Sequence, residues 1–132
     1  MYQAQKAMDA AVLAVKPGGT IILAAQCEEG LGEEKFADWV NTASCPQDIM
    51  ERFNHQFELG GHKAFAICRI LQQAEILLLS SLTEQQTRDL FLKPVYSMEE
   101  ALQHAFQRHG EQARIIVMPE APKIAVKLNR SE

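Results

Sequence analysis

Apolar residues recur at helical spacing over residues 2–15, where Ala4, Met8 and Val15 belong to one stripe. The pair Gly18-Gly19 predicts the end of this helix, because glycine readily adopts the backbone conformation that terminates helices. Further helices are predicted over residues 33–42, 46–57, 62–73, from 83 onward and 97–109.

Three short runs are mostly apolar and lie between the helices, as is typical of strands covered on both faces. They cover residues 20–25, 75–80 and 114–118; a shorter strand is predicted at 94–96, and 123–128 is either an edge strand or a tail. Strands that alternate with helices indicate the α/β class. We expect one domain over residues 1–132, with a three-layer, mostly parallel sheet and helices on both faces, of the Rossmann or flavodoxin type.

Ligands of such sheets usually bind beyond the carboxyl ends of the strands. This rule directs attention to residues 26–32, 80–81 and 118–120. The first helix has to pack alongside the same edge if its polar residues are to join them.

Composition narrows the class of protein. The chain has 132 residues, of which 47% are hydrophobic and 23% charged, and this balance is typical of a soluble globular domain. Its net charge of −4 argues against nucleic-acid binding, which requires a basic face. The sequence has neither a membrane-length apolar run nor a signal-peptide pattern. The three cysteines form no Cys-x-x-Cys pair, so we expect reduced thiols and a cytoplasmic protein.

The first helix begins without a Ser, Thr, Asp or Asn to cap it, which suggests a piece of a larger protein cut upstream of a functional cluster. Tyr2, Gln3 and Lys6 can converge on one small ligand, since residues three and four apart share a helix face. A phenol, a carboxamide and an ammonium suit a carboxylate or a hydroxy acid. The alternative is a frayed, solvated first turn.

A second candidate is the sequence Gly60-Gly61-His62-Lys63 at a helix start. Free backbone N–H groups and the helix dipole favour an anion there, and Lys63 adds positive charge. The alternative is an ordinary glycine loop with an exposed lysine and a capping histidine.

The loop after the first strand contains Gly30-x-Gly32, a partial dinucleotide fingerprint. Lys35 occupies the third glycine position, and Glu28 and Glu29 repel a pyrophosphate. The two carboxylates can instead act as an acid/base pair, bind a cation, or simply be solvated. No two histidines have the i, i+4 spacing of a helical zinc site, so no metal ligand is assigned.

Four segments in order resemble the carboxyl-terminal domain of the nickel-dependent lactate racemase family: Tyr-Gln-Ala-Gln-Lys-Ala-Met-Asp-Ala-Ala, Val-Lys-Pro-Gly-Gly-Thr-Ile-Ile-Leu, Cys-Glu-Glu-Gly-Leu-Gly and Gly-Gly-His-Lys-Ala. The resemblance implies a two-domain racemase of 2-hydroxy acids with its active site between the domains. It also implies hydride transfer to a nickel-pincer nucleotide, which is held by an amino-terminal domain together with the acid/base histidines.

By that resemblance Lys6 binds the substrate, Tyr2 and Gln3 line the site, and His62, Lys63 and Phe65 lie close to it. The expected partners are the amino-terminal domain and a small 2-hydroxy acid. We assign no catalytic residue, and we expect this chain alone to bind no cofactor and to be inactive. Two alternatives stay open: a Rossmann-type domain that binds a nucleotide or S-adenosylmethionine, and a non-catalytic interaction module. The sequence does not select the hydroxy acid.

Overall fold

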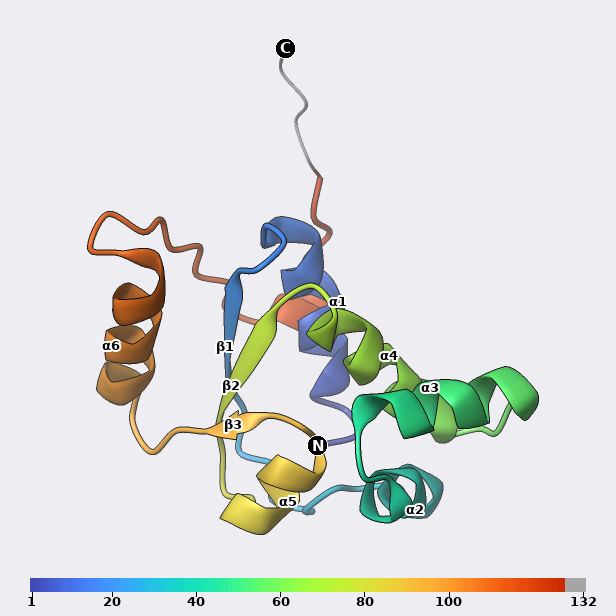
Figure 1. Cartoon of the computed structure of the whole chain (residues 1–132). Helices are drawn as coiled ribbons and strands as arrows, with labels where there is room; N and C mark the ends of the chain where they lie inside the picture. Colours follow the sequence, from blue (N-terminus) through green and yellow to red (C-terminus); the bar gives the residue numbers. More distant parts are fainter. Residues whose placement is uncertain (128–132) are drawn as a thin grey trace.

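The computed structural model describes residues 1–127 and contains a three-stranded sheet between helices (Figure 1). The elements are α1 (Gln5–Ala14), β1 (Thr20–Ala24), α2 (Glu34–Thr42), α3 (Pro46–His55), α4 (Gly61–Leu71), β2 (Glu75–Leu79), α5 (Glu84–Asp89), β3 (Lys93–Pro94), α6 (Met98–His109) and the 3-10 helix η1 (Ala121–Lys123). Within the described range, no helix is long and apolar enough to cross a membrane.

The sheet has the order β1-β2-β3, and both pairs of strands are parallel. Thr20 of β1 pairs with Glu75 of β2, and Leu77 of β2 pairs with Lys93 of β3. Helices α1 and α4 lie on one side of the sheet and α6 lies on the other (Figure 1). The predicted α/β class, with a parallel sheet and helices on both faces, is therefore confirmed.

Alternating side chains of the strands enter two hydrophobic clusters of unequal size. The larger cluster contains Ile21, Leu23, Ile76 and Leu78 of the sheet, packed with residues of α1, α2 and α4. The smaller one, beneath α6, consists of the buried residues Leu77, Val95 and Ala101 with the half-buried Ile22 and Leu79. The layer formed by α6 thus rests on far less apolar packing than the opposite layer does.

Side-chain caps lie at two of the predicted helix starts, residues 83 and 97. The Thr83 hydroxyl accepts a hydrogen bond from the Gln86 amide at 3.1 Å, and the Ser97 hydroxyl accepts one from the Glu100 amide at 3.0 Å. Pro46 is the first residue of α3, where its missing N–H has no partner to lose. These local signals place helix starts correctly because the capping bonds involve only residues close in sequence.

The strand predicted at residues 114–118 is wrong. The third strand is instead β3, which overlaps the short strand predicted at 94–96 at Pro94 and begins one residue earlier. Residues 113–118 have no regular structure. A β-branched run favours a strand only where neighbouring backbone groups pair with it, and no strand lies hydrogen-bonded beside this run within residues 1–127. Of the segment 123–128, residue 123 ends η1, residues 124–127 are not a strand, and residue 128 lies outside the described residues.

Glu75 ties α6 to the sheet. Its carboxylate, at the start of β2, accepts a hydrogen bond from the Thr20 hydroxyl at 2.7 Å and lies 3.0 Å from Lys93 Nζ. His104 and Arg108 of α6 contact the same carboxylate at 3.0 and 3.2 Å. Burial raises the pKa of Glu75, but the Thr20 hydrogen bond and the nearby Lys93 and His104 outweigh that effect and hold it at about 2, below the usual 4.5.

Candidate functional site

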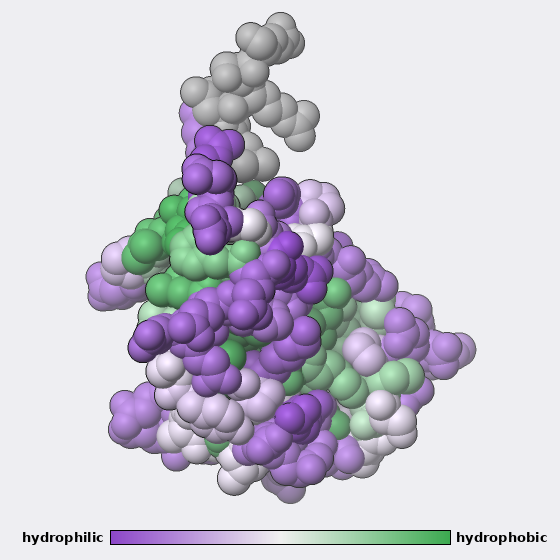
Figure 2. Space-filling view, turned by 60° about the vertical axis from the view of Figure 1, so that its left-hand side comes forward, coloured by the Kyte–Doolittle hydropathy of each residue, from purple (hydrophilic) through white to green (hydrophobic). Residues whose placement is uncertain are grey.

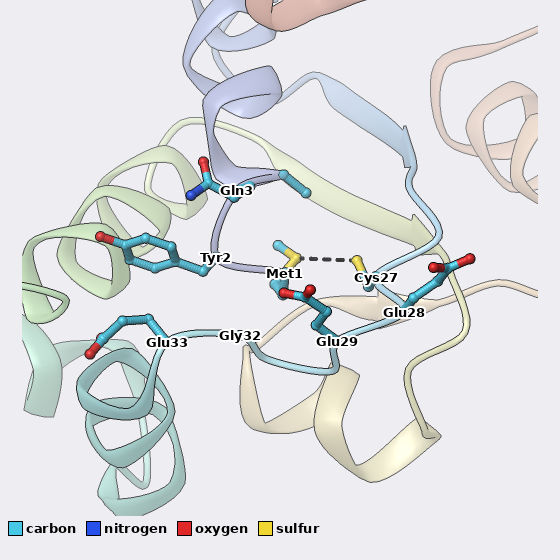
Figure 3. Close-up of a pocket in the computed structure, with 9 residues that line it drawn as sticks. Met1, Tyr2, Gln3, Cys27, Glu28, Glu29, Gly32 and Glu33 are labelled. Atoms are coloured by element: carbon cyan, nitrogen blue, oxygen red, sulfur yellow. Dashed lines mark hydrogen bonds between the residues drawn. The ribbon is translucent and has the colours of Figure 1, made fainter.

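A shallow, open depression of about 570 Å³ lies where β1 ends and the following loop meets the start of the chain (Figure 3). Its lining residues are Met1, Tyr2, Gln3, Ala4, Cys27, Glu28, Glu29, Gly32 and Glu33. Tyr2 and Glu33 lie at one end of it, and Glu28 lies at the other. The position agrees with the rule that ligands of parallel sheets bind beyond the carboxyl ends of the strands.

Backbone hydrogen bonds hold the first residues against this loop. The Met1 nitrogen donates to the Gly30 carbonyl at 2.7 Å, and the Tyr2 amide donates to the Leu31 carbonyl at 2.9 Å. The Met1 side chain is only 5% exposed, and its sulfur lies 4.0 Å from Cys27 Sγ. Residues 1–4 form a fixed turn before α1, so the prediction of a helix from residue 2 is corrected to a start at Gln5. The turn is not the frayed segment of the alternative interpretation.

Tyr2, Lys6 and Lys63 come together between the turn before α1, α1 itself and α4. The Tyr2 ring packs edge-on against Phe36 at 5.8 Å between centroids, and Lys63 Nζ lies 5.2 Å from the centre of the Tyr2 ring. Burial lowers the pKa of Lys63, the positive charge of Lys6 lowers it further, and Asp9 opposes both effects. Two cations and a phenol therefore share one small region.

Asp9 is the anion of this region, and a buried amide holds it. The Gln5 side chain is 1% exposed, and its Nε2 donates to Asp9 Oδ1 at 2.6 Å. Asp9 is three residues from Lys6 on α1, so these two side chains fall on one side of the helix. The sequence analysis missed Gln5 and Asp9; their i, i+4 spacing is the signal that could have identified them.

The other predicted residues have different surroundings. Gln3 is exposed at the rim of the depression. His62 Nδ1 accepts a hydrogen bond from the Gly60 amide at 3.0 Å and so stabilises its own turn. Phe65 stacks on Phe53 of α3, with 4.3 Å between ring centroids, and thus joins the α3–α4 contact rather than the Tyr2 cluster.

The two glycines before α4 have a packing role. Gly60 has φ +96°, and an added Cβ there would collide with Glu33 and Lys35; an added Cβ at Gly61 would collide with the Trp39 ring. Close approach of α4 to α2 therefore requires glycine at both positions. This observation accounts for the glycine pair without an anion.

Glu33 occupies the place where a dinucleotide phosphate would sit in a Rossmann-type domain. Its carboxylate accepts hydrogen bonds from the Lys35 and Phe36 amides at 3.0 and 2.8 Å, and so caps α2 directly after the Gly30-x-Gly32 loop. The loop carbonyls of Gly30 and Leu31 are already bonded to residues 1 and 2. The positive end of α2 thus has an internal anion, which disfavours the nucleotide-binding alternative. Glu is not a preferred N-cap residue, so sequence reasoning missed it.

The other residues predicted to lie beyond the carboxyl ends of the strands have different surroundings. Ser81 does not line the depression, but its amide donates to the carbonyl of Gln26, the residue before Cys27, at 2.9 Å. Residues 118–120 do not line the depression; they precede η1, which packs on α1. Glu28 and Glu29 are exposed, as the solvated interpretation expects. The described residues contain no cluster of three or more His, Cys, Asp or Glu side chains that could hold a metal ion.

The parallel sheet, the helices on both of its faces and the depression at its carboxyl edge define a domain of the α/β class. Residues 1–126 match the family model described as the lactate racemase C-terminal domain. The chain belongs to this family.

Two relatives and one solved structure support the assignment to this family. The chain is 31% identical to the lactate racemase of Thermoanaerobacterium thermosaccharolyticum and 27% identical to that of Lactiplantibacillus plantarum, with 96% of the chain and 31% of each relative covered. The solved structure of the lactate racemase apoprotein from T. thermosaccharolyticum is similar with a TM-score of 0.88 and 30% identity, over 96% of this chain and 32% of that one. The chain thus spans about a third of the length of these relatives.

Proposed function

We propose that this chain is the substrate-positioning domain of a lactate racemase-like enzyme that racemises or epimerises a small 2-hydroxy acid. The observation that carries the proposal is the position of the Lys63 ammonium over the Tyr2 ring, with Lys6 close enough for its positive charge to lower the pKa of Lys63. Two ammonium groups attract a carboxylate, and the half-buried position of Lys63 strengthens that attraction, because water screens the charge less there.

Each side chain then has a defined task. Lys6 and Lys63 bind the substrate carboxylate, and Tyr2 and Gln3 donate hydrogen bonds that orient the substrate at the rim of the depression. His62 acts indirectly, because its hydrogen bond to the Gly60 amide fixes the turn that carries Lys63. Phe65 supports α4 from the α3 side. Precise positioning of this kind lowers the barrier by fixing the reacting carbon before chemistry begins.

The nickel-pincer nucleotide that the family resemblance implies does not fit the described residues of this chain. They offer no cluster of three or more His, Cys, Asp or Glu side chains that could hold its metal ion. In the proposal, the amino-terminal domain of the parent enzyme therefore holds the cofactor and performs the hydride chemistry, and no step on this chain involves it.

The proposal is tested in the full-length parent enzyme with L-lactate as the first substrate. Lys6→Ala and Lys63→Met are expected to lower kcat/KM for racemisation at least tenfold while circular dichroism shows an unchanged fold. Lys16→Ala is the matched control, because Lys16 is an exposed lysine just beyond the far end of α1. Wild-type rates for both site variants, with lactate and with other 2-hydroxy acids, would refute the proposal. Racemisation by the isolated 132-residue chain loaded with the cofactor would refute the division of labour.

A further inference from the structure

Three consecutive apolar side chains are exposed after α6. Ile115, Ile116 and Val117 are 54%, 67% and 79% exposed. Figure 2 brings the α6 side of Figure 1 forward and shows apolar surface gathered on its upper part. Apolar residues scattered singly on a surface are ordinary, but three in succession expose both faces of an extended segment and indicate an unfilled contact.

The backbone of this run is also unpaired. Within residues 1–127, none of residues 114–118 donates or accepts a backbone hydrogen bond. An extended, β-branched segment with free N–H and C=O groups is the kind of element that pairs with a strand of another polypeptide unit. Among residues 1–127, the side chains and the backbone of this run therefore both lack partners.

The run is nevertheless held at both ends. Before it, the Arg108 guanidinium donates to the Gly18 carbonyl at 3.4 Å, and His109 Nε2 lies 2.7 Å from the Thr20 hydroxyl oxygen. After it, η1 packs on α1. Because the anchors fix where the run lies, a partner that binds it has less conformational entropy to remove.

The length of the relatives indicates the occupant. About two-thirds of each relative lies outside the part that this chain matches, since the match covers 31% of it. We infer that Ile115–Val117 is a docking surface for that remaining part of the parent protein, which covers the apolar side chains and pairs with the free backbone. This inference rests on family membership and on the run itself, and it does not depend on the substrate role of Lys6 and Lys63.

The test uses the chain and the region encoded upstream of Tyr2 in the parent gene, produced as two polypeptides. Amides 115–118 are expected to exchange rapidly in the chain alone and at least tenfold more slowly in the complex. Ile116→Asp and Val117→Asp are expected to weaken the complex at least tenfold by calorimetry. Met98→Asp is the matched control: Met98 is 42% exposed at the first position of α6, where an added carboxylate suits the helix dipole.

Several results would overturn the inference. Slow exchange of amides 115–118 in the monomeric chain alone would mean that the run pairs within the chain. Slow exchange that grows with concentration would mean that a second copy is the occupant. Equal weakening by Met98→Asp and Ile116→Asp, unchanged affinity of the Ile116 and Val117 variants, or a parent gene without the upstream region would also contradict it.

Discussion

The ammonium of Lys63 lies 5.2 Å from the centre of the Tyr2 ring, although 60 residues separate the two in sequence. The contact joins the turn before α1 to the first turn of α4. It brings together two of the four sequence segments that carry the family resemblance, the one with Tyr2 to Lys6 and the one with Gly60 to Lys63. These two segments, far apart in sequence, thus lie in one region of the structure.

The first prediction concerns the charge of that region. Lys6→Met should raise the pKa of Lys63 because it removes a neighbouring positive charge, whereas Asp9→Asn should lower it further because it removes the opposing negative charge. An NMR titration of the Lys63 side chain measures both changes. Lys16→Met should leave the pKa unchanged, and shifts of the opposite sign would show that Lys6 and Asp9 do not face Lys63.

The second prediction concerns Glu75. Glu75→Gln should destabilise the domain by on the order of 2 kcal/mol at pH 7, because it removes the carboxylate to which Lys93, His104 and Arg108 are paired. The pKa of Glu75 is depressed from 4.5 to about 2, so its contribution is complete above pH 4.5 and is lost as the pH falls from 4.5 toward 2.

Urea unfolding at pH 7, 4 and 2.5 measures this loss. The difference between wild type and Glu75→Gln should shrink progressively at the lower pH values. Glu51→Gln, which removes an exposed carboxylate of α3, should change stability by less than about 0.5 kcal/mol. A constant difference across the pH range would contradict the assigned role.

The third prediction separates two costs of replacing glycine. Gly61→Ala should destabilise the domain by about 1–3 kcal/mol or more, because its Cβ would overlap the Trp39 ring. Gly110→Ala should cost about 1–2 kcal/mol, since φ is +89° there but no atom lies within 4 Å of the added Cβ. Thermal unfolding compares the two. If Gly61→Ala were neutral, the close packing of α4 on α2 would be wrong.

The fourth prediction concerns thiol reactivity. Cys68 is 1% exposed, and burial, with a smaller effect of Cys45, raises its pKa from 9.0 to about 12. A shift of three pKa units lowers the thiolate fraction roughly 1,000-fold. Ellman's reagent should therefore label Cys27 and Cys45 in the folded protein and Cys68 only after unfolding. Equal labelling rates for all three cysteines would contradict the buried position.

Elements defined by local signals could be predicted from the sequence. The helices predicted to begin at residues 83 and 97 do begin there, capped by Thr83 and Ser97, and the apolar runs at 20–25 and 75–80 contain β1 and β2. The run at 114–118 has the same local composition but no strand beside it. Its failure illustrates that strand formation depends on pairing partners, which a propensity argument cannot supply.

The candidate site could be predicted only in part for a similar reason. Tyr2, Lys6 and Lys63 follow from motif spacing, and they meet because α1 packs on α4. Glu33 and the Gln5–Asp9 pair could not be identified without the structure, because a cap by Glu is uncommon and a buried glutamine has no distinctive pattern. Conversely, Phe65 has the right residue type near the motif but faces α3.

The unequal size of the two hydrophobic clusters bears on how the domain opens. Only a few apolar side chains hold α6 on the sheet. Polar contacts supplement them: the Glu75 carboxylate with His104 and Arg108, the Gly18 carbonyl with Arg108, and the Thr20 hydroxyl with His109. Elements with so little apolar contact detach in sub-global openings at a smaller free energy than global unfolding requires. The domain is therefore a cooperative unit of α1, α2, α4 and the strands, with α6 as a separately releasable layer held largely by polar contacts.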